Sequence, residues 1–198
     1  MTKEVEFFFD VGSPSSYLAA TQLPTLCEAA GATLIYRPML LGGVFQAVGN
    51  KSPMEVPAKG RYVFEDLLRH AQRYGVPLKH NPFFPINTLL LMRAATALQL
   101  KQPDRFLPYV DAVFRAIWID QRDMNDASVV AAVVQRIGLD PASVMAAVTD
   151  PEVKAALKAT TDEAVARGVF GAPTVFVGSQ MFFGQDRLDF IRDVLART

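Results

Sequence analysis

The chain has 198 residues, of which 51% are apolar and 20% are charged, a composition typical of soluble globular proteins that can bury a sizeable core without disulfides or metals. Its 20 basic residues equal its 20 acidic residues in number, and no long run of one sign is present. Neither nucleic acid nor an anionic membrane surface is therefore a predicted partner.

The start of the chain and its cysteine content favour a cytoplasmic protein. Glu4 and Glu6 stand where a signal peptide would begin its apolar region, and no apolar run is long enough to cross a bilayer. The single cysteine, Cys27, cannot form an internal disulfide, and we expect it to be a small packed thiol. Because only His70 and His80 could join it, no zinc-ligand spacing exists and no metal site is predicted.

The stretch from Phe7 to Tyr17 predicts a buried strand, a tight turn at Val11-Gly12 and a helix that begins at Ser13-Pro14. A helix N-terminus carries unpaired N–H groups and a partial positive charge, so it favours an anion in front of it. A thiolate is one candidate anion, because the same field lowers the pKa of a thiol. The other interpretation is that Ser13 only caps the helix.

The next segments predict a parallel βαβ unit followed by a long helical region. The first helix should stop near Gly31, and residues 33–37 have the composition of a strand. The segment with Gly42-Gly43 and Gly49-Asn50 is expected to be irregular. Further helices are predicted at 59–74 with Val63, Leu67, Leu68 and Ala71 buried, from a cap at Asn87 to Leu100, from Pro103 towards Asp120 with Pro108 in the first turn, between Asp126 and Gly138, and after Asp140 and Asp150.

The C-terminal part returns to strands. Residues 174–177 and 180–183, separated by Gly178-Ser179, predict a hairpin, and a last helix follows Gly184. The βαβ and ββα units are the two halves of a thioredoxin-like domain. We therefore expect an α/β fold, with residues 1–41 and 155–198 in the thioredoxin-like domain and residues 42–154 in an inserted all-helical domain.

In this fold the residue before the third strand faces the start of the first helix. A cis Pro173 would turn the N–H and C=O of Ala172 outward, where they could pair with an extended peptide, whereas an ordinary trans proline would not. Redox members of the fold carry two cysteines where this chain has serines, in Ser13-Pro14-Ser15-Ser16. The site cannot cycle a disulfide, but it is suited to a thiol from another molecule, such as glutathione.

Five motifs in order resemble one family along nearly the whole chain. They are Phe-Asp-x-x-Ser-Pro-x-Ser-Tyr at residues 9–17, Gly49-Asn50, Tyr74-Gly75-Val76-Pro77, Val169-Phe170-Gly171-Ala172-Pro173-Thr174 and Phe183-Gly184-Gln185-Asp186-Arg187-Leu188. This pattern is similar to that of the kappa-class glutathione transferase and 2-hydroxychromene-2-carboxylate isomerase family, which is related to the DsbA disulfide oxidoreductases.

The resemblance implies glutathione as cofactor, with Ser13 bonded to its sulfur and Ala172 paired with its cysteinyl backbone. Gln185 and Asp186 would hold the γ-glutamyl end, although Asp186 could instead only favour the helix dipole. Lys59 matches a position that contacts glutathione or closes the site, and a solvated helix residue is the alternative. The full implied set is Ser13, Asn50, Lys59, Ala172, Pro173, Phe183, Gly184, Gln185 and Asp186.

For the substrate, the resemblance implies a small aromatic 2-oxo acid bound by Phe45, Phe84 and Trp118. Phe45 and the Glu55-Val56 region do not reproduce the basic and amide groups expected for its carboxylate, and Arg61 and Arg93 are the alternatives. The implied activity is glutathione-dependent isomerisation of 2-hydroxychromene-2-carboxylate to trans-o-hydroxybenzylidenepyruvate in aromatic catabolism, through reversible thiolate addition, by a homodimer. A kappa-like transferase and a non-redox, DsbA-like peptide-binding protein are the alternatives.

Overall fold

A four-stranded mixed sheet forms the centre of the computed structural model, which describes residues 3–197. The strands are β1 (Lys3–Phe9), β2 (Ala32–Pro38), β3 (Thr174–Val177) and β4 (Gln180–Phe183), in the spatial order β2-β1-β3-β4. β1 pairs in parallel with β2 and antiparallel with β3, and β3 pairs antiparallel with β4. The predicted thioredoxin-like fold with a helical insertion is confirmed.

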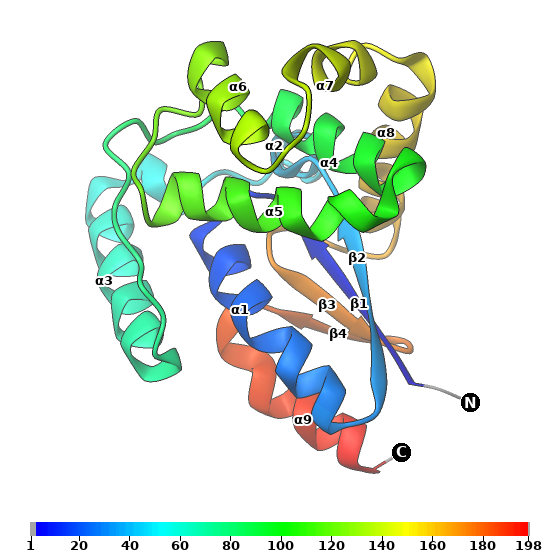
Figure 1. Cartoon of the computed structure of the whole chain (residues 1–198). Helices are drawn as coiled ribbons and strands as arrows, with labels where there is room; N and C mark the ends of the chain where they lie inside the picture. The colour runs from blue at the N-terminus through cyan, green and yellow to red at the C-terminus, as the bar shows by residue number, and fades with distance from the viewer. Residues whose placement is uncertain (1–2, 198) are drawn as a thin grey trace.

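Helices cover the sheet and fill the long connection between β2 and β3. In Figure 1, α1 and α9 lie side by side near the two termini, α4 and α5 cross above the strands, and α3 stands to one side. The helices are α1 (Pro14–Ala29), α2 (Leu41–Val48), α3 (Pro57–Tyr74), α4 (Leu89–Lys101), α5 (Pro103–Trp118), α6 (Ala127–Arg136), α7 (Pro141–Ala147), α8 (Pro151–Ala166) and α9 (Leu188–Arg197), with 3₁₀ turns η1 (Pro53–Glu55) and η2 (Gln185–Arg187).

The three consecutive phenylalanines of β1 require cover on both faces of the sheet. Successive side chains of a strand point to opposite faces, so Phe7 and Phe9 enter the main core while Phe8 enters a second, smaller core. All three are fully buried. The smaller core is closed by residues of α2 and α8, which belong to the helical region and its junction with the sheet.

The segment expected to be irregular contains α2, which begins at Leu41 and includes Gly42 and Gly43. The expectation was wrong because tertiary packing outweighs the low helix propensity of glycine here. A Cβ atom on Gly43 would lie 3.3 Å from Cγ2 of Thr161, so the glycine lets α2 approach α8 closely. The helix ends at Gly49, which has a φ of 67°.

Three details of the predicted helices also differ. Pro108 lies beyond the first turn of α5, which remains helical because its buried face packs into the core. Leu68 is exposed, since the buried side of α3 is narrower than expected. Thr88 rather than Asn87 is the cap residue of α4, although Oδ1 of Asn87 does accept a hydrogen bond from the N–H of Leu89 at 3.2 Å.

The other helix boundaries follow the sequence signals. Asp126, Asp140 and Asp150 each accept a hydrogen bond from the first turn of the helix they precede. The division into residues 1–41, 42–154 and 155–198 stays a prediction, and its second boundary falls inside α8. Within residues 3–197, no single helix is long and apolar enough to span a membrane, and only the pair of α6 and α7, bent by 115°, passes by length and composition.

Trp118 anchors the contact between the helical region and the turn after β1. Its side chain is 2% exposed, and its Nε1 donates a hydrogen bond to the carbonyl oxygen of Val11 at 2.9 Å. The structure thus places this predicted substrate residue in the core, where it holds the turn that leads to Ser13.

We expect Trp118→Phe to lower the free energy of unfolding by about 2–4 kcal/mol, because it leaves a void and an unpaired carbonyl. Urea unfolding followed by circular dichroism measures this, since the variant lacks the chain's one tryptophan. Phe190→Leu is the control, because Phe190 is 56% exposed and its shortening should change stability little. Equal stability of wild type and Trp118→Phe would contradict the anchoring role.

Candidate functional site

Ser13 is held at the start of α1, as the sequence predicts. Its Oγ accepts a hydrogen bond from the N–H of Ser16 at 3.1 Å and donates one to the carbonyl oxygen of Ala172 at 3.0 Å. Pro14 occupies the first helical turn, and Ser13 is 5% exposed. One hydroxyl therefore joins the N-terminus of α1 to the segment before β3.

The segment before β3 has the conformation that the thioredoxin-like fold predicts. The Ala172-Pro173 peptide bond is cis, and Ala172 is half-buried. The N–H of Gly184 donates to the carbonyl oxygen of Pro173 at 3.0 Å, which brings the end of β4 beside this segment. The backbone of Ala172 thus lies between Ser13 and the residues that begin η2.

Most of the residues implied to bind glutathione gather around Ala172. Nδ2 of Asn50 donates a hydrogen bond to the carbonyl oxygen of Phe170 at 2.8 Å. The ring centroid of Phe170 lies 4.6 Å from that of Phe183, which precedes Gly184. Ser13, Asn50, Ala172, Pro173, Phe183 and Gly184 are therefore connected through direct contacts or chain neighbours.

The other residues implied to bind glutathione lie at the start of η2, next to this group around Ala172. Gly184 has a φ of 101°, and a Cβ atom there would lie 2.5 Å from Oδ1 of Asp186, so only glycine suits the position. Gln185 is 7% exposed, and its carbonyl oxygen accepts a hydrogen bond from the hydroxyl of Tyr74 at 2.7 Å. Asp186 is exposed and forms an ion pair with Arg187.

The structure does not connect Lys59 to this group. Lys59 is exposed on α3 and makes no hydrogen bond or ion pair within residues 3–197. In the same part of the chain, no group of three His, Cys, Asp or Glu side chains is placed to hold a metal ion.

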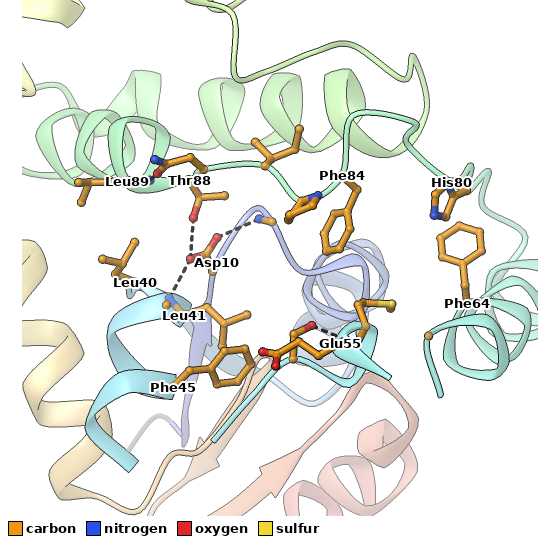
Figure 2. A pocket seen from close by; sticks show the side chains of 18 of the residues that line it. Asp10, Leu40, Leu41, Phe45, Glu55, Phe64, His80, Phe84, Thr88 and Leu89 are labelled. Carbon is orange, nitrogen blue, oxygen red and sulfur yellow. Dashed lines mark hydrogen bonds between the residues drawn. The ribbon is translucent and has the colours of Figure 1, made fainter. Parts of the chain in front are cut away.

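A large cavity of about 1010 Å³ lies beside the turn that delivers Ser13. Phe45 and Phe84, two of the predicted substrate residues, line it, and Figure 2 shows Phe45 below Asp10 and Phe84 to the right of Asp10. Trp118 does not line the cavity, and its ring contacts Phe84 with the centroids 5.9 Å apart. The other residues that line the cavity include Leu40, Leu41, Met54, Arg61, Phe64, Ile86 and Leu89.

Asp10 is a residue of this cavity that the sequence reasoning did not single out. Its carboxylate is 1% exposed and accepts hydrogen bonds from Gly12 N at 2.9 Å, Leu41 N at 2.9 Å and Thr88 Oγ1 at 3.0 Å, which Figure 2 shows as dashed lines. Burial raises the pKa of Asp10, and the hydrogen bonds oppose that rise. An acidic residue directly after three consecutive phenylalanines was the signal available in the sequence.

Comparisons with known proteins agree with this fold. A family model described as a DSBA-like thioredoxin domain matches residues 4–196. A 2-hydroxychromene-2-carboxylate isomerase of Sphingobium xenophagum is 36% identical over 200 residues, covering 98% of this chain and 99% of that relative. Glutathione S-transferase kappa 1 of Homo sapiens is 28% identical over 208 residues, covering 98% and 92%.

A solved structure of a 2-hydroxychromene-2-carboxylate isomerase is also similar along the whole chain. It has a TM-score of 0.83 and 32% identity, and the match covers 98% of this chain and 95% of that one. The chain belongs to the DsbA-like thioredoxin family, and within it to the family of the 2-hydroxychromene-2-carboxylate isomerases. The resemblance identified from the sequence motifs is confirmed.

The pKa of Asp10 gives a prediction about stability and pH. Because the folded-state pKa is raised above 3.8, the contribution of Asp10 to stability is complete below that pH and declines as the pH rises through the folded-state value. The Asp10→Asn variant has no titrating group at this position, so its stability does not show this decline with pH. The difference in unfolding free energy, wild type minus variant, should therefore fall as the pH rises from about 3.8, by at most about 1.4 kcal/mol per pH unit.

Urea unfolding of both proteins over a series of pH values measures this difference, and the other carboxylates cancel in the comparison. A difference that grows with pH would show that the three hydrogen bonds to Asp10 outweigh its burial.

Proposed function

We propose that the protein is a glutathione-dependent isomerase that interconverts 2-hydroxychromene-2-carboxylate and trans-o-hydroxybenzylidenepyruvate. The observation that carries the proposal is the hydroxyl of Ser13, which lies at a helix N-terminus, 3.0 Å from the Ala172 carbonyl and beside a large cavity. A relative with 36% identity over nearly the whole chain bears the isomerase name. The cytoplasmic location and the homodimer stay predictions.

The residues present fit a bound glutathione. The Ala172 backbone is half-buried and borders Ser13, so a cysteinyl residue paired with Ala172 would present its thiol to the hydroxyl. The exposed carboxylate of Asp186 suits the ammonium of a γ-glutamyl group. Glutathione supplies a thiolate that adds reversibly to a conjugated double bond and leaves again, so none is consumed.

The role of Ser13 is to stabilise that thiolate rather than to attack. Its Oγ–H, which donates to Ala172 in the structure, would turn to donate to the sulfur. The N-terminus of α1 adds its partial positive charge, which lowers the pKa of a thiol. A serine nucleophile would need an adjacent general base, and the contacts of Ser13 Oγ are with the N–H of Ser16 and the carbonyl of Ala172.

The cavity would hold the organic substrate. Gly12 lines it directly before Ser13, so a molecule in the cavity borders the position proposed for the sulfur. Phe45, Phe64 and Phe84 offer rings to an aromatic body.

A kappa-like glutathione transferase is the second candidate, because a kappa-class relative is 28% identical over nearly the whole chain. The two functions differ in the fate of glutathione. A transferase consumes one molecule for each electrophile conjugated, whereas the proposed isomerase returns it.

The ultraviolet absorbance of 2-hydroxychromene-2-carboxylate, with protein and with or without a catalytic amount of glutathione, tests the proposal. We expect rapid equilibration with the trans isomer only when glutathione is present, and no loss of glutathione. Consumption of glutathione would favour the transferase. No conversion in either condition would overturn the isomerase proposal and leave the transferase and peptide binding at the Ala172 backbone as the functions to test.

Ser13→Ala should raise the pKa of the bound glutathione thiol by about one to two units and lower turnover at neutral pH about 10- to 100-fold. Titration of the thiolate absorbance and the pH profile of kcat measure the two effects. Ser128→Ala is the control, because it removes an exposed hydroxyl from the start of α6. An unchanged thiol pKa in Ser13→Ala would exclude the proposed role of this hydroxyl.

A further inference from the structure

The charged side chains that line the cavity differ in whether they have a hydrogen-bond or ion-pair partner. Asp10, Glu55 and Glu65 are its acidic residues, and each one has a hydrogen-bond or ion-pair partner in the structure. Asp10 accepts hydrogen bonds, Glu55 pairs with Lys51 at 3.8 Å, and Glu65 pairs with Arg69 at 3.9 Å.

Arg61 is the arginine that lines this cavity, and it makes no ion pair or hydrogen bond within residues 3–197. It lies in the first half of α3, one turn before Phe64. Arg93, which the sequence offered equally, does not line the cavity. An arginine remains charged at all ordinary pH values, so Arg61 gives the cavity wall a permanent positive charge that is not in an ion pair with any carboxylate of residues 3–197.

The remaining walls are largely apolar. The apolar residues that line the cavity include Leu40, Leu41, Phe45, Met54, Phe64, Phe84, Ile86 and Leu89. Figure 2 shows Phe45, Phe64 and Phe84 around the same space as Asp10. An apolar cavity with one uncompensated cation matches a molecule with an apolar aromatic body and a single negative group.

We propose that Arg61 binds the carboxylate of the substrate and makes the cavity selective for aromatic monocarboxylates. A guanidinium forms two parallel hydrogen bonds with a carboxylate, which fixes the orientation of the molecule as well as its position. The identity of the reacting substrate rests on the proposed isomerase function, whereas the binding preference does not.

The acidic neighbours sharpen this selectivity. Glu55 and Glu65 lie in the same cavity and are exposed, so their partners compensate them only in part. A second carboxylate on the ligand would meet their charge. Aromatic dicarboxylates should therefore bind more weakly than aromatic monocarboxylates of the same size.

Binding without turnover tests the proposal independently of the reaction. Isothermal titration calorimetry of the protein, without glutathione, compares coumarin-3-carboxylate with the neutral coumarin-3-carboxamide. Wild type should prefer the carboxylate, and Arg61→Gln should raise its Kd roughly tenfold while leaving the Kd of the amide unchanged. Arg61→Lys should give an intermediate Kd, because it keeps the charge and loses the paired geometry.

Arg93→Gln is the matched control, since it removes an arginine that does not line the cavity. Higher salt should weaken binding of the carboxylate to wild type and have little effect on Arg61→Gln. The proposal is overturned if wild type shows no preference for the carboxylate, or if Arg61→Gln weakens carboxylate and amide equally.

The reaction provides a separate readout. If isomerisation occurs, Arg61→Gln should raise KM about tenfold with a smaller change in kcat, because the carboxylate is present before and after the reaction. Isomerisation with an unchanged KM in the variant would overturn the role of Arg61 alone. Carboxylate-selective binding through Arg61 without any isomerisation would overturn the proposed function alone.

Discussion

The buried carboxylate of Asp10 is the interaction on which the site depends. Its two oxygens accept hydrogen bonds from Gly12, from Leu41 at the start of α2 and from Thr88 at the start of α4. Neither α2 nor α4 has a side-chain cap on its own N-cap residue, so Asp10 supplies to Leu41 an acceptor that a local cap would otherwise provide. One side chain thus connects β1, the turn before Ser13 and two helices of the insertion.

This connection explains how the helical region and the thioredoxin-like halves make one site. Two hydrogen bonds hold the turn from Asp10 to Ser13. Trp118 donates one to the carbonyl oxygen of Val11, and Ser13 donates the other to the carbonyl oxygen of Ala172. The glutathione-binding surface that we propose consists mostly of backbone and short side chains around Ala172. The cavity is made by side chains of α2, α3 and the segments around η1 and α4. Gly12 lies where the two parts meet.

Local signals in the sequence predicted the elements that depend on neighbours in the chain. Some features involve only residues a few positions apart, so their patterns can be recognised directly in the sequence. They are the cap at Ser13, the turn at Gly178 and the aspartates before α6, α7 and α8. The helix at Gly42-Gly43 forms through contact with α8, far along the chain, and its local composition indicates a loop. The position of Trp118 and the uncompensated charge of Arg61 likewise depend on packing between distant segments.

The absence of a reactive protein thiol is consistent with a site that uses a thiol from solution. Ser13 and Ser16 occupy positions where redox relatives have cysteines, so no protein disulfide can form there with glutathione. Cys27 is 2% exposed, and burial raises its pKa to about 11, so at neutral pH it is protonated and a poor nucleophile. In the mechanism that we propose, the nucleophile is the bound ligand itself, so the reaction needs a thiolate that is stabilised but still free to leave. A hydroxyl hydrogen bond and a helix N-terminus meet both requirements, since they lower the thiol pKa without forming a covalent bond to the sulfur.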